Sequence, residues 1–473
     1  MKKKSYLLVI AVCWLVFPVR SQSKVNPLLQ KAVTTMGTNN LHAIRYSGSG
    51  TSGVFGQNHS PHSDWPVLII KSYTRTIDYT AMSSNEDIVR TYQNPPSKGG
   101  GAPFLNEQKQ TIGVAGMPPS LDGLDDRHLQ VLVTPHGFLK QALSNSTSAI
   151  KKLKGGGAEI SFKVGKYKIV GVTNKQGLVE KVTTWTANPV LGDTPIETLY
   201  SDYKDYQGIK FPSHIIQNMG GRMVLNLALS GVETNVSNIV QPTAPATLPP
   251  PAVVTVESKM LAEGVWLLGG GSHNSLLVEF NDYVAVADAP NNEARSLAVI
   301  EEAKKLVPNK PIKYIINSHH HFDHSGGLRT YVAEGAAVIT SDINPKFYQE
   351  AWKAPRTLAP DKLSQNPREA TFVEVNDKYV LTDGTRTLEL HHNLGSNHNA
   401  GMLFGYLPKE KILFVADEYS PGRLVNGALV PVAKGFADNL YLNLDRLNLD
   451  VVTIAPAHGA VVPVSEMFKD IGK

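Results

Sequence analysis

The sequence predicts a mainly antiparallel β domain followed by a layered α/β domain, and three observations support this division. A proline-rich stretch, "VQPTAPATLPPPAVVTVE" at residues 240–257, carries no charge before Glu257. Such a composition favours an extended linker that buries little surface. Before this stretch, apolar and polar residues alternate as in half-buried strands. After it, strand-like and helix-like segments interleave, which is typical of α/β architecture.

The proline-rich stretch also gives the domain boundaries. We expect residues 24–239 to form the β domain, residues 240–254 the linker and residues 255–473 the α/β domain. Two domains agree with the usual size of roughly 100–200 residues for each domain. The alternative is that the stretch is an ordered surface loop within one domain.

Alternation in the β domain is clearest at residues 158–187, where Ile160 and Phe162 share one face of a predicted strand. Residues 200–218 and 221–235 predict two further antiparallel strands. No catalytic constellation is evident in this region. Its histidines are scattered, and we expect them to be ordinary surface or core residues: His42, His59, His62, His128, His136 and His214.

The α/β domain is predicted from short apolar runs separated by amphipathic segments. The predicted strands are residues 263–270, 274–280, 282–290, 312–318, 336–341, 371–375, 386–392, 401–407, 412–417 and 451–457. The predicted helices are residues 293–307, 327–335 and 343–354. Several strands follow one another directly, so we expect a pair of sheets covered by helices.

The N-terminus is typical of a secretory signal peptide. Lys2, Lys3 and Lys4 precede an apolar run at residues 6–19, and small residues follow. The run is too short to cross a bilayer, and no other segment reaches a transmembrane length. The sequence therefore predicts that residues 1–23 are removed and that the protein is periplasmic or secreted.

Removing this segment changes what charge and cysteine content imply. The chain has 46 basic and 41 acidic residues, and four of the basic ones lie in the segment, which leaves 42 against 41. No strong basic field remains for nucleic acid. The only cysteine, Cys13, leaves as well, so the mature chain has no disulfide and no thiolate. We expect a small-molecule substrate, no nucleic-acid partner and no membrane span.

A dense histidine motif lies in "YIINSHHHFDHSGGLRTY", residues 314–331, directly after a predicted strand. Ligands gather at strand ends in α/β folds. His319 and His321 are two positions apart and can point to one side of an extended turn, and Asp323 and His324 can face a second point nearby. Imidazole and carboxylate together are what divalent metals recruit. A solvated polar loop is the alternative.

The spacing His-x-His-x-Asp-His resembles the signature of the metallo-β-lactamase superfamily, over about residues 255–473. The resemblance extends to "VADAP" with Asp288, "NLGSNHNAGMLFGYLP" with His398, "KILFVADEY" with Asp417 and "VVTIAPAHG" with His458, all in the expected order. It implies an αββα metallo-β-lactamase sandwich in this half of the chain.

The resemblance also implies two Zn²⁺ per chain and a ligand set. The first metal would be held by His319, His321 and His398, the second by Asp323, His324 and His458, and Asp417 would bridge both. This set looks most like the hydroxyacylglutathione hydrolase and lactonase branches, and it departs from β-lactamases that use a cysteine ligand. All of these residues lie in the second domain, so we expect residues 255–473, expressed alone, to bind metal as the full chain does.

The implied chemistry is hydrolysis. Two cations would lower the pKa of a shared water to give hydroxide, which attacks a carbonyl or phosphoryl centre, and Asp323 would orient this nucleophile. We expect an exported zinc hydrolase that cleaves an ester, thioester, lactone or lactam bond. The alternatives are a β-lactamase proper, a mononuclear iron enzyme similar to persulfide dioxygenases, and a binding protein with a structural metal site.

Neighbouring polar residues have more open interpretations. His320 lies between two predicted ligands and should point away from the metals in a structural role. His391 and His392 end a predicted strand and could be hydrogen-bond partners of the ligands or surface residues. His273 and Asn274 lie in a glycine-rich turn, where contact with substrate and an ordinary flexible turn are both open.

Overall fold

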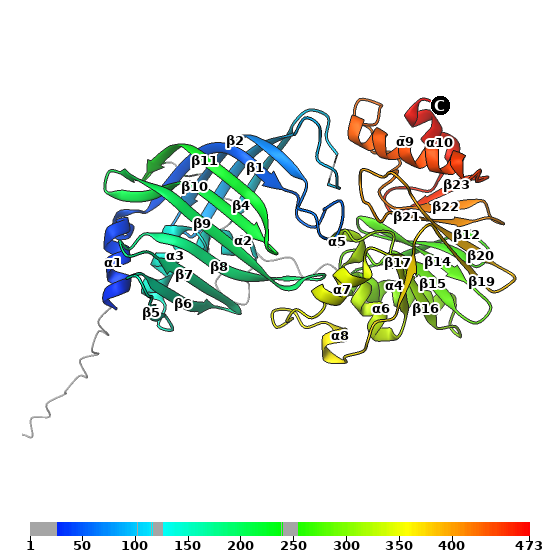
Figure 1. Cartoon of the computed structure of the whole chain (residues 1–473), viewed down its shortest axis with the longest axis horizontal. Coiled ribbons are helices and arrows are strands. Elements are labelled where there is room, and N and C mark those ends of the chain that lie inside the picture. Colours follow the sequence, from blue (N-terminus) through cyan, green and yellow to red (C-terminus); the bar gives the residue numbers. More distant parts are fainter. Residues whose placement is uncertain (1–25, 102, 115, 117–125, 238, 240–253) are drawn as a thin grey trace, which may run out of the picture.

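The computed structural model describes residues 26–101, 103–114, 116, 126–237, 239 and 254–473. The predicted signal peptide and nearly all of the predicted linker lie outside these residues, so both stay predictions. The described chain contains a strand-rich N-terminal part and an α/β C-terminal part, which lie side by side (Figure 1). Within the described residues, no helix combines the length and hydrophobicity needed to span a bilayer.

The N-terminal part is built on one 11-stranded sheet in the order β4-β3-β2-β1-β11-β10-β9-β8-β7-β6-β5. Its strand pairings are antiparallel among the described residues, as the sequence predicted. Its strands are β1 (Ala43–Gly53), β2 (Val67–Asp78), β3 (Ser83–Tyr92), β4 (Gln108–Val114), β5 (Ala149–Lys152), β6 (Ala158–Val164), β7 (Tyr167–Thr173), β8 (Val179–Asn188), β9 (Gly192–Tyr206), β10 (Ile209–Met219) and β11 (Arg222–Thr234).

Helices α1 (Pro27–Met36), α2 (Asp126–Leu132) and α3 (Pro135–Ser144) share a core with this sheet. Alternation puts Ile160 and Phe162 of β6 on the buried face, where they meet side chains of the helices. The Phe138 ring of α3 lies directly on Gly171 of β7. A Cβ at Gly171 would lie only 2.2 Å from this ring, so glycine allows the close approach. This close approach anchors α3 to the sheet.

The C-terminal part has two sheets, in the orders β12-β13-β14-β15-β16-β17-β18 and β19-β20-β21-β22-β23-β24. The first contains β12 (Glu257–Ala262), β13 (Val265–Gly270), β14 (His273–Glu279), β15 (Val284–Ala287), β16 (Ile312–Ile316), β17 (Ala337–Ser341) and β18 (Phe372–Val375). The second contains β19 (Lys378–Thr382), β20 (Thr387–His392), β21 (Leu403–Leu407), β22 (Ile412–Val415), β23 (Thr453–Pro456) and β24 (Val462–Pro463).

Three apolar layers hold these sheets and their helices together. One layer joins the inner faces of the two sheets, with Leu276, Ile316, Leu403 and Phe414 among its residues. The outer face of the first sheet packs against α4 (Glu293–Leu306), α6 (Leu328–Glu334) and α7 (Pro345–Ala351), and that of the second against α9 (Pro431–Arg446) and α10 (Val464–Ile471). The result is the predicted αββα sandwich, with helices outside and sheets inside (Figure 1).

The parallel strands of the sandwich place their carboxyl ends at one edge. β15 and β16 are parallel in the first sheet, and β22 and β23 are parallel in the second. The segments that follow these strands therefore meet across the two sheets. The chain between β16 and α6 contains the histidine motif, part of which forms the short helix α5 (Phe322–Ser325).

Specific contacts join the two parts of the molecule. The Arg356 guanidinium, after α7, donates to the backbone oxygens of Asn188, Pro189 and Val190 between β8 and β9. At a second point, Phe55 and Trp65 of the β1–β2 loop pack against Phe322 at 5.3 and 5.8 Å between ring centroids. The β1–β2 loop, residues 54–66, thus contacts α5, which carries part of the histidine motif.

Candidate metal centre

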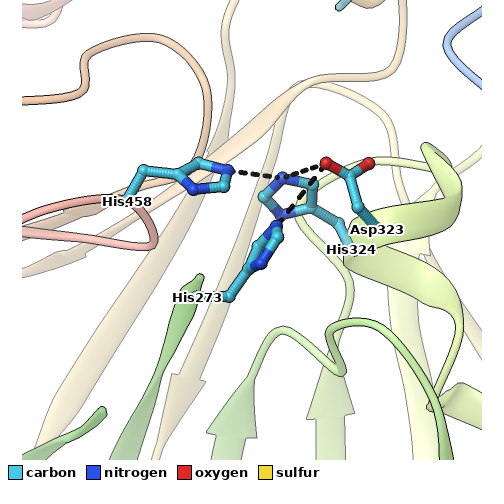
Figure 2. A group of neighbouring side chains, drawn as sticks. All are labelled: His273, Asp323, His324 and His458. Atoms are coloured by element: carbon cyan, nitrogen blue, oxygen red, sulfur yellow. Dashed lines mark hydrogen bonds and ion pairs between the residues drawn. The ribbon is translucent and has the colours of Figure 1, made fainter. Parts of the chain in front are cut away.

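Polar side chains at or near the ends of five strands converge into two groups. In each group, the possible ligand atoms lie within 4.8 Å of one another. The first group contains His319, His321, His398 and Asp417, and the second contains His273, Asp323, His324 and His458. The structure therefore brings together all of the residues proposed as ligands from the sequence. It adds His273 from the start of β14, which Figure 2 shows beside Asp323, His324 and His458.

Asn317, at the end of β16, fixes the turn that carries the histidine motif. Its amide nitrogen donates to the backbone oxygen of His319 at 2.5 Å, and its side-chain oxygen accepts from the Tyr348 hydroxyl at 2.7 Å. Ser325 then donates to the backbone oxygen of His321 at 2.9 Å. These bonds are buried, so the positions of the ligand side chains are set by the fold and not by solvent.

Asp417, after β22, belongs to the first group and also contacts histidines of the second. One carboxylate oxygen is 3.0 Å from His324 Nε2 and 3.1 Å from His398 Nε2, and the other is 3.1 Å from His458 Nε2. Although burial opposes its charge, the neighbouring His324 and His398 hold the pKa of Asp417 well below its ordinary value. A single anion thus faces both groups, which is the position that a bridging ligand requires.

The first group fits a divalent cation, because three of its inward-facing nitrogens make no hydrogen bond among the described residues and lie around one point with the Asp417 carboxylate. His319 Nε2, His321 Nδ1 and His398 Nε2 are buried and make no hydrogen bond to the described residues. Leaving a buried polar atom unpaired costs roughly 1–3 kcal/mol. Burial lowers the pKa of His319 to about 4, which keeps the imidazole neutral. Neutral imidazole is the form that coordinates metal.

The opposite nitrogens of two of these rings are held by hydrogen bonds. His319 Nδ1 lies 2.9 Å from the Ser318 hydroxyl, and His321 Nε2 lies 3.0 Å from the backbone oxygen of Asn58. A partner on the outer nitrogen fixes both the tautomer and the direction of the ring. The sequence pattern identified these histidines, but it gave no indication of Asn58.

The second group is oriented by Asp288. The buried Asp288 carboxylate lies 2.8 Å from His324 Nδ1 and also accepts from the backbone nitrogen and hydroxyl of Ser318. His324 Nε2 therefore points inward, where it lies 3.3 Å from His458 Nε2 (Figure 2). Burial alone would lower the pKa of His324, but the carboxylates of Asp417, Asp323 and Asp288 raise it well above its ordinary value.

His273 and Asn274 have different surroundings. His273 Nε2 lies 3.5 Å from an Asp323 oxygen and has no hydrogen-bond partner in the described part of the chain. Asn274 instead donates to the backbone oxygens of Pro456 and Gly459, on either side of His458. Of these two candidate substrate contacts, the structure places His273 among the possible ligands and gives Asn274 the role of holding the His458 loop.

The remaining histidines lie outside both groups. His320 is buried between Asn58 and Asn399, at 3.2 and 3.1 Å, so its ring has partners away from the centre. His391 pairs with Glu389 at 2.9 Å. His392 lies within hydrogen-bond distance of two backbone oxygens and contacts no ligand group.

Residues 268–458 match the family model described as the metallo-beta-lactamase superfamily. The C-terminal domain of this chain belongs to that superfamily. The match begins in β13 and ends at His458, so it includes every member of both groups. No curated protein matches the chain.

Solved metallo-β-lactamase structures are similar to part of the chain. The enzyme from Pontibacter korlensis is 18% identical, with a TM-score of 0.37, and the match covers 46% of this chain and 98% of that one. FIM-1 from Pseudomonas aeruginosa in its mono-zinc form is also 18% identical, with a TM-score of 0.37 and coverage of 47% and 96%. DIM-1 is 16% identical, with a TM-score of 0.37 and coverage of 46% and 97%.

The metallo-β-lactamase domain is not alone in forming the centre, because the β1–β2 loop of the N-terminal domain lies against it. The Gln57 side chain donates to Asp323 at 2.8 Å, and the backbone nitrogen of Phe322 donates to the Gly56 oxygen at 3.2 Å. These contacts place an amide group beside a candidate catalytic carboxylate. The sequence offered no signal for Gln57, since it occurs in a loop without a recognisable motif.

A second N-terminal segment lies directly over the first group. A Cβ on Gly100 would lie 2.7 Å from the Cε1 atoms of both His321 and His398. Real Cβ contacts are essentially never this short, so only glycine fits without a shift of the histidine rings. The backbone between β3 and β4 therefore forms a roof over the metallo-β-lactamase domain.

A pocket of about 480 Å³, here called the metal pocket, opens between these parts. Asp323, His398, Asp417 and His458 contribute to its floor. One wall is apolar and comes from the segment before α9 and from its first turns: Leu424, Val425, Leu429, Val430, Ala433 and Phe436. Arg423 lies at the rim, 3.3 Å from His458 Nδ1. The pocket thus combines a polar floor with an apolar side.

Proposed function

We propose that this protein is an exported, zinc-dependent hydrolase that cleaves an ester, thioester, lactone or lactam bond. The single observation that supports this most is the position of Asp417 between two groups of buried imidazoles. Structural zinc sites usually have four closed ligands, whereas catalytic sites keep an open position. Here both groups face a pocket of about 480 Å³, which leaves room for a substrate.

The proposed ligands divide as the geometry groups them. His319, His321 and His398 would hold one Zn²⁺, while Asp323, His324 and His458 would hold the other, with Asp417 shared. When bound, the metals would supply positive charge that acidifies water and polarises the bond to be cleaved. Neutral imidazoles with carboxylates are a donor set that suits Zn²⁺.

Asp323 has the surroundings of a residue that orients a nucleophile. One of its oxygens accepts from Gln57, and the other lies 3.5 Å from His273 Nε2. Burial opposes its charge, but His324 and His273 hold its pKa well below the ordinary value. The carboxylate therefore stays ionised at neutral pH and can accept a hydrogen bond from water. It faces the metal pocket, where the attacked carbonyl would lie.

The proposal is tested by metal analysis and a substrate panel. Protein purified from its native host without added metal should contain two zinc ions per chain. It should hydrolyse at least one of a chromogenic cephalosporin, a lactone, a thioester and a carboxylic ester, and Asp323→Asn should lose that activity. A single iron per chain would overturn the proposal in favour of an oxygenase. Mass measurement of the same material should show a chain that begins near residue 24.

A further inference from the structure

A second cavity lies between the two domains, beside the metal pocket. Its volume is about 330 Å³, and we call it the interdomain cavity. The N-terminal sheet and its loops supply one side, and the first turns of α9 supply the other. Its main apolar side chains are Val54, Leu68, Tyr92, Phe104, Val432 and Phe436. Neither domain encloses this space by itself.

The interdomain cavity adjoins the metal pocket. Gly101 and Phe436 line both, and the neighbouring residues Val432 and Ala433 face the cavity and the pocket respectively. The Phe436 ring is 4.9 Å from the ring of His398, with the planes at 82°. One aromatic side chain thus contacts a proposed metal ligand and also lines the cavity. An apolar surface therefore runs along α9 from the metal pocket to the interdomain cavity.

The lining of the cavity selects for apolar groups. Tyr92 and Phe104 stack with their ring centroids 4.2 Å apart and their planes 3° apart, which presents a flat aromatic wall. At the edge, Arg90 donates to the side-chain oxygens of Gln108 and Gln110 at 3.2 and 3.0 Å. Arg90 Nε has no hydrogen-bond partner among the described residues, but the larger share of the cavity surface offers contact to carbon. Ligand sites of this kind bind apolar groups by burial.

We propose that the substrate is an ester with an extended acyl chain, and that this chain lies in the interdomain cavity while its carbonyl lies in the metal pocket. The proposal rests on the proposed hydrolase function. Water adds its oxygen to the acyl carbon, the bond from that carbon to the alcohol oxygen breaks, and the alcohol leaves with a proton from the water. The N-terminal domain thereby selects substrates by the length of their acyl chain.

The test compares 4-nitrophenyl esters from acetyl to dodecanoyl, using the full-length zinc-loaded protein. In the wild type, kcat/KM should rise by up to about 4-fold for each methylene that becomes fully buried, until the cavity is filled. Val432→Trp fills the cavity from the α9 side, so the ratio of dodecanoyl to acetyl kcat/KM should fall by at least ~10-fold. The matched control is Leu442→Trp on the same helix, where Leu442 is 61% exposed. It should leave the ratio unchanged.

A binding measurement separates the two proposals. Dodecanoic acid should bind the wild type and Leu442→Trp equally, and bind Val432→Trp at least ~10-fold more weakly, as measured by calorimetry on zinc-loaded and metal-free protein. Circular dichroism and zinc content report whether Val432→Trp is folded, and Val432→Phe replaces it if it is not. Equal binding by all variants, or turnover without chain-length dependence, would overturn the cavity assignment. Failure to hydrolyse any ester with two zincs bound would overturn the ester-hydrolase proposal itself.

Discussion

The two domains differ in what fills their centres. The N-terminal sheet and its helices enclose an apolar core, with Leu29, Phe138 and Ile160 among its fully or nearly fully buried side chains. In the metallo-β-lactamase domain, the edge where the two sheets meet encloses His319, His321 and other buried ionisable groups. Burying apolar side chains is favourable by itself, whereas burying unpaired imidazoles is costly.

The N-terminal domain thus has a mainly apolar core, whereas the candidate site lies in the metallo-β-lactamase domain. Among the described residues, the N-terminal core leaves a few buried polar atoms unpaired, such as Arg75 Nε and Tyr79 Oη, but it contains no group of possible metal ligands. The metallo-β-lactamase domain has apolar layers of its own, but its polar centre contains buried imidazole nitrogens without hydrogen-bond partners among the described residues, which a bound cation would satisfy. Metal should therefore stabilise one domain much more than the other, and four predictions test or sharpen this contrast.

The largest expected effect is that of metal removal. Ligand binding to the folded state contributes about 4 kcal/mol when the free metal is 1,000 times its Kd. Dialysis against a chelator should therefore lower the unfolding temperature of the metallo-β-lactamase domain by about 10 °C, at roughly 2–4 °C per kcal/mol. Scanning calorimetry with hydrogen exchange assigns each transition to a domain, and adding zinc back is the control. Equal shifts in the unfolding temperatures of the two domains would contradict the expectation that metal stabilises one domain more than the other.

The second prediction concerns His136, a fully buried histidine of the N-terminal domain. Its ring lies between the Thr38 hydroxyl and the Lys210 backbone oxygen, and burial lowers its pKa to about 4. The unfolded chain, with a pKa near 6.5, binds more protons between these values. The free energy of unfolding of this domain should therefore fall by at most ~3 kcal/mol as the pH drops from 6.5 to 4.

His136→Gln should remove most of this pH dependence, because its amide can keep one donor and one acceptor without titrating. Urea unfolding at pH 4.5 and pH 7, followed by hydrogen exchange of β6 to β10 amides, measures the effect. His42→Gln, at an exposed histidine, is the matched control and should retain the wild-type slope. A wild-type domain with equal stability at both pH values would show that His136 does not titrate as its burial indicates.

The third prediction is that Asp417→Asn removes one metal and lowers turnover by at least ~10²-fold, the scale of losing a metal ligand or a group that stabilises charge. The amide keeps the shape of the side chain but lacks the negative charge that faces both groups. Zinc per chain and kcat on the substrate found by the panel are the measurements. Asp438→Asn, an exposed ion-pair partner on α9, is the control. Two zincs in Asp417→Asn would refute the bridge.

The smallest effect is expected for Gln57→Leu. This change removes the hydrogen bond from the N-terminal loop to Asp323 and should weaken zinc binding by about 10-fold, as for other groups that orient ligands. Competition with a chromophoric chelator measures the affinity. Gln176→Leu, in an exposed turn distant in sequence, is the matched control. If residues 255–473 alone bind zinc as tightly as the full chain, the loop has no part in binding.

The proposed ligands could be identified from the sequence because their signals are local. Four of the residues lie within one turn and helix start, and His398, Asp417 and His458 each follow or precede a recognisable apolar strand. The strands at residues 158–234 were likewise evident from alternation. In contrast, β1 contains "SGSGTSG", whose small residues give little alternation, so β1 was not predicted, although its partner β11 was.

The contribution of the N-terminal domain to the candidate site could not be predicted, because no local sequence motif identifies the residues involved. Asn58 acts through its backbone oxygen, which every residue has, and Gly100 acts by lacking a side chain. For His273 the sequence left substrate contact and an ordinary turn open and gave no sign of a possible ligand, since its distance from Asp323 is set by the pairing of β13 with β14. Such features depend on tertiary contacts and carry no signature in a single sequence.

The hydrogen bond between Asn58 and His321 has a consequence for the order of folding. It joins residues 263 positions apart, so it closes one of the longest loops in the chain. Contacts of such high sequence separation form after local ones, because their entropic cost must be met before they contribute stability. Each domain can assemble its own sheets earlier, during or soon after synthesis. We therefore expect the region around the proposed ligands to reach its final geometry after the sheets of both domains have formed.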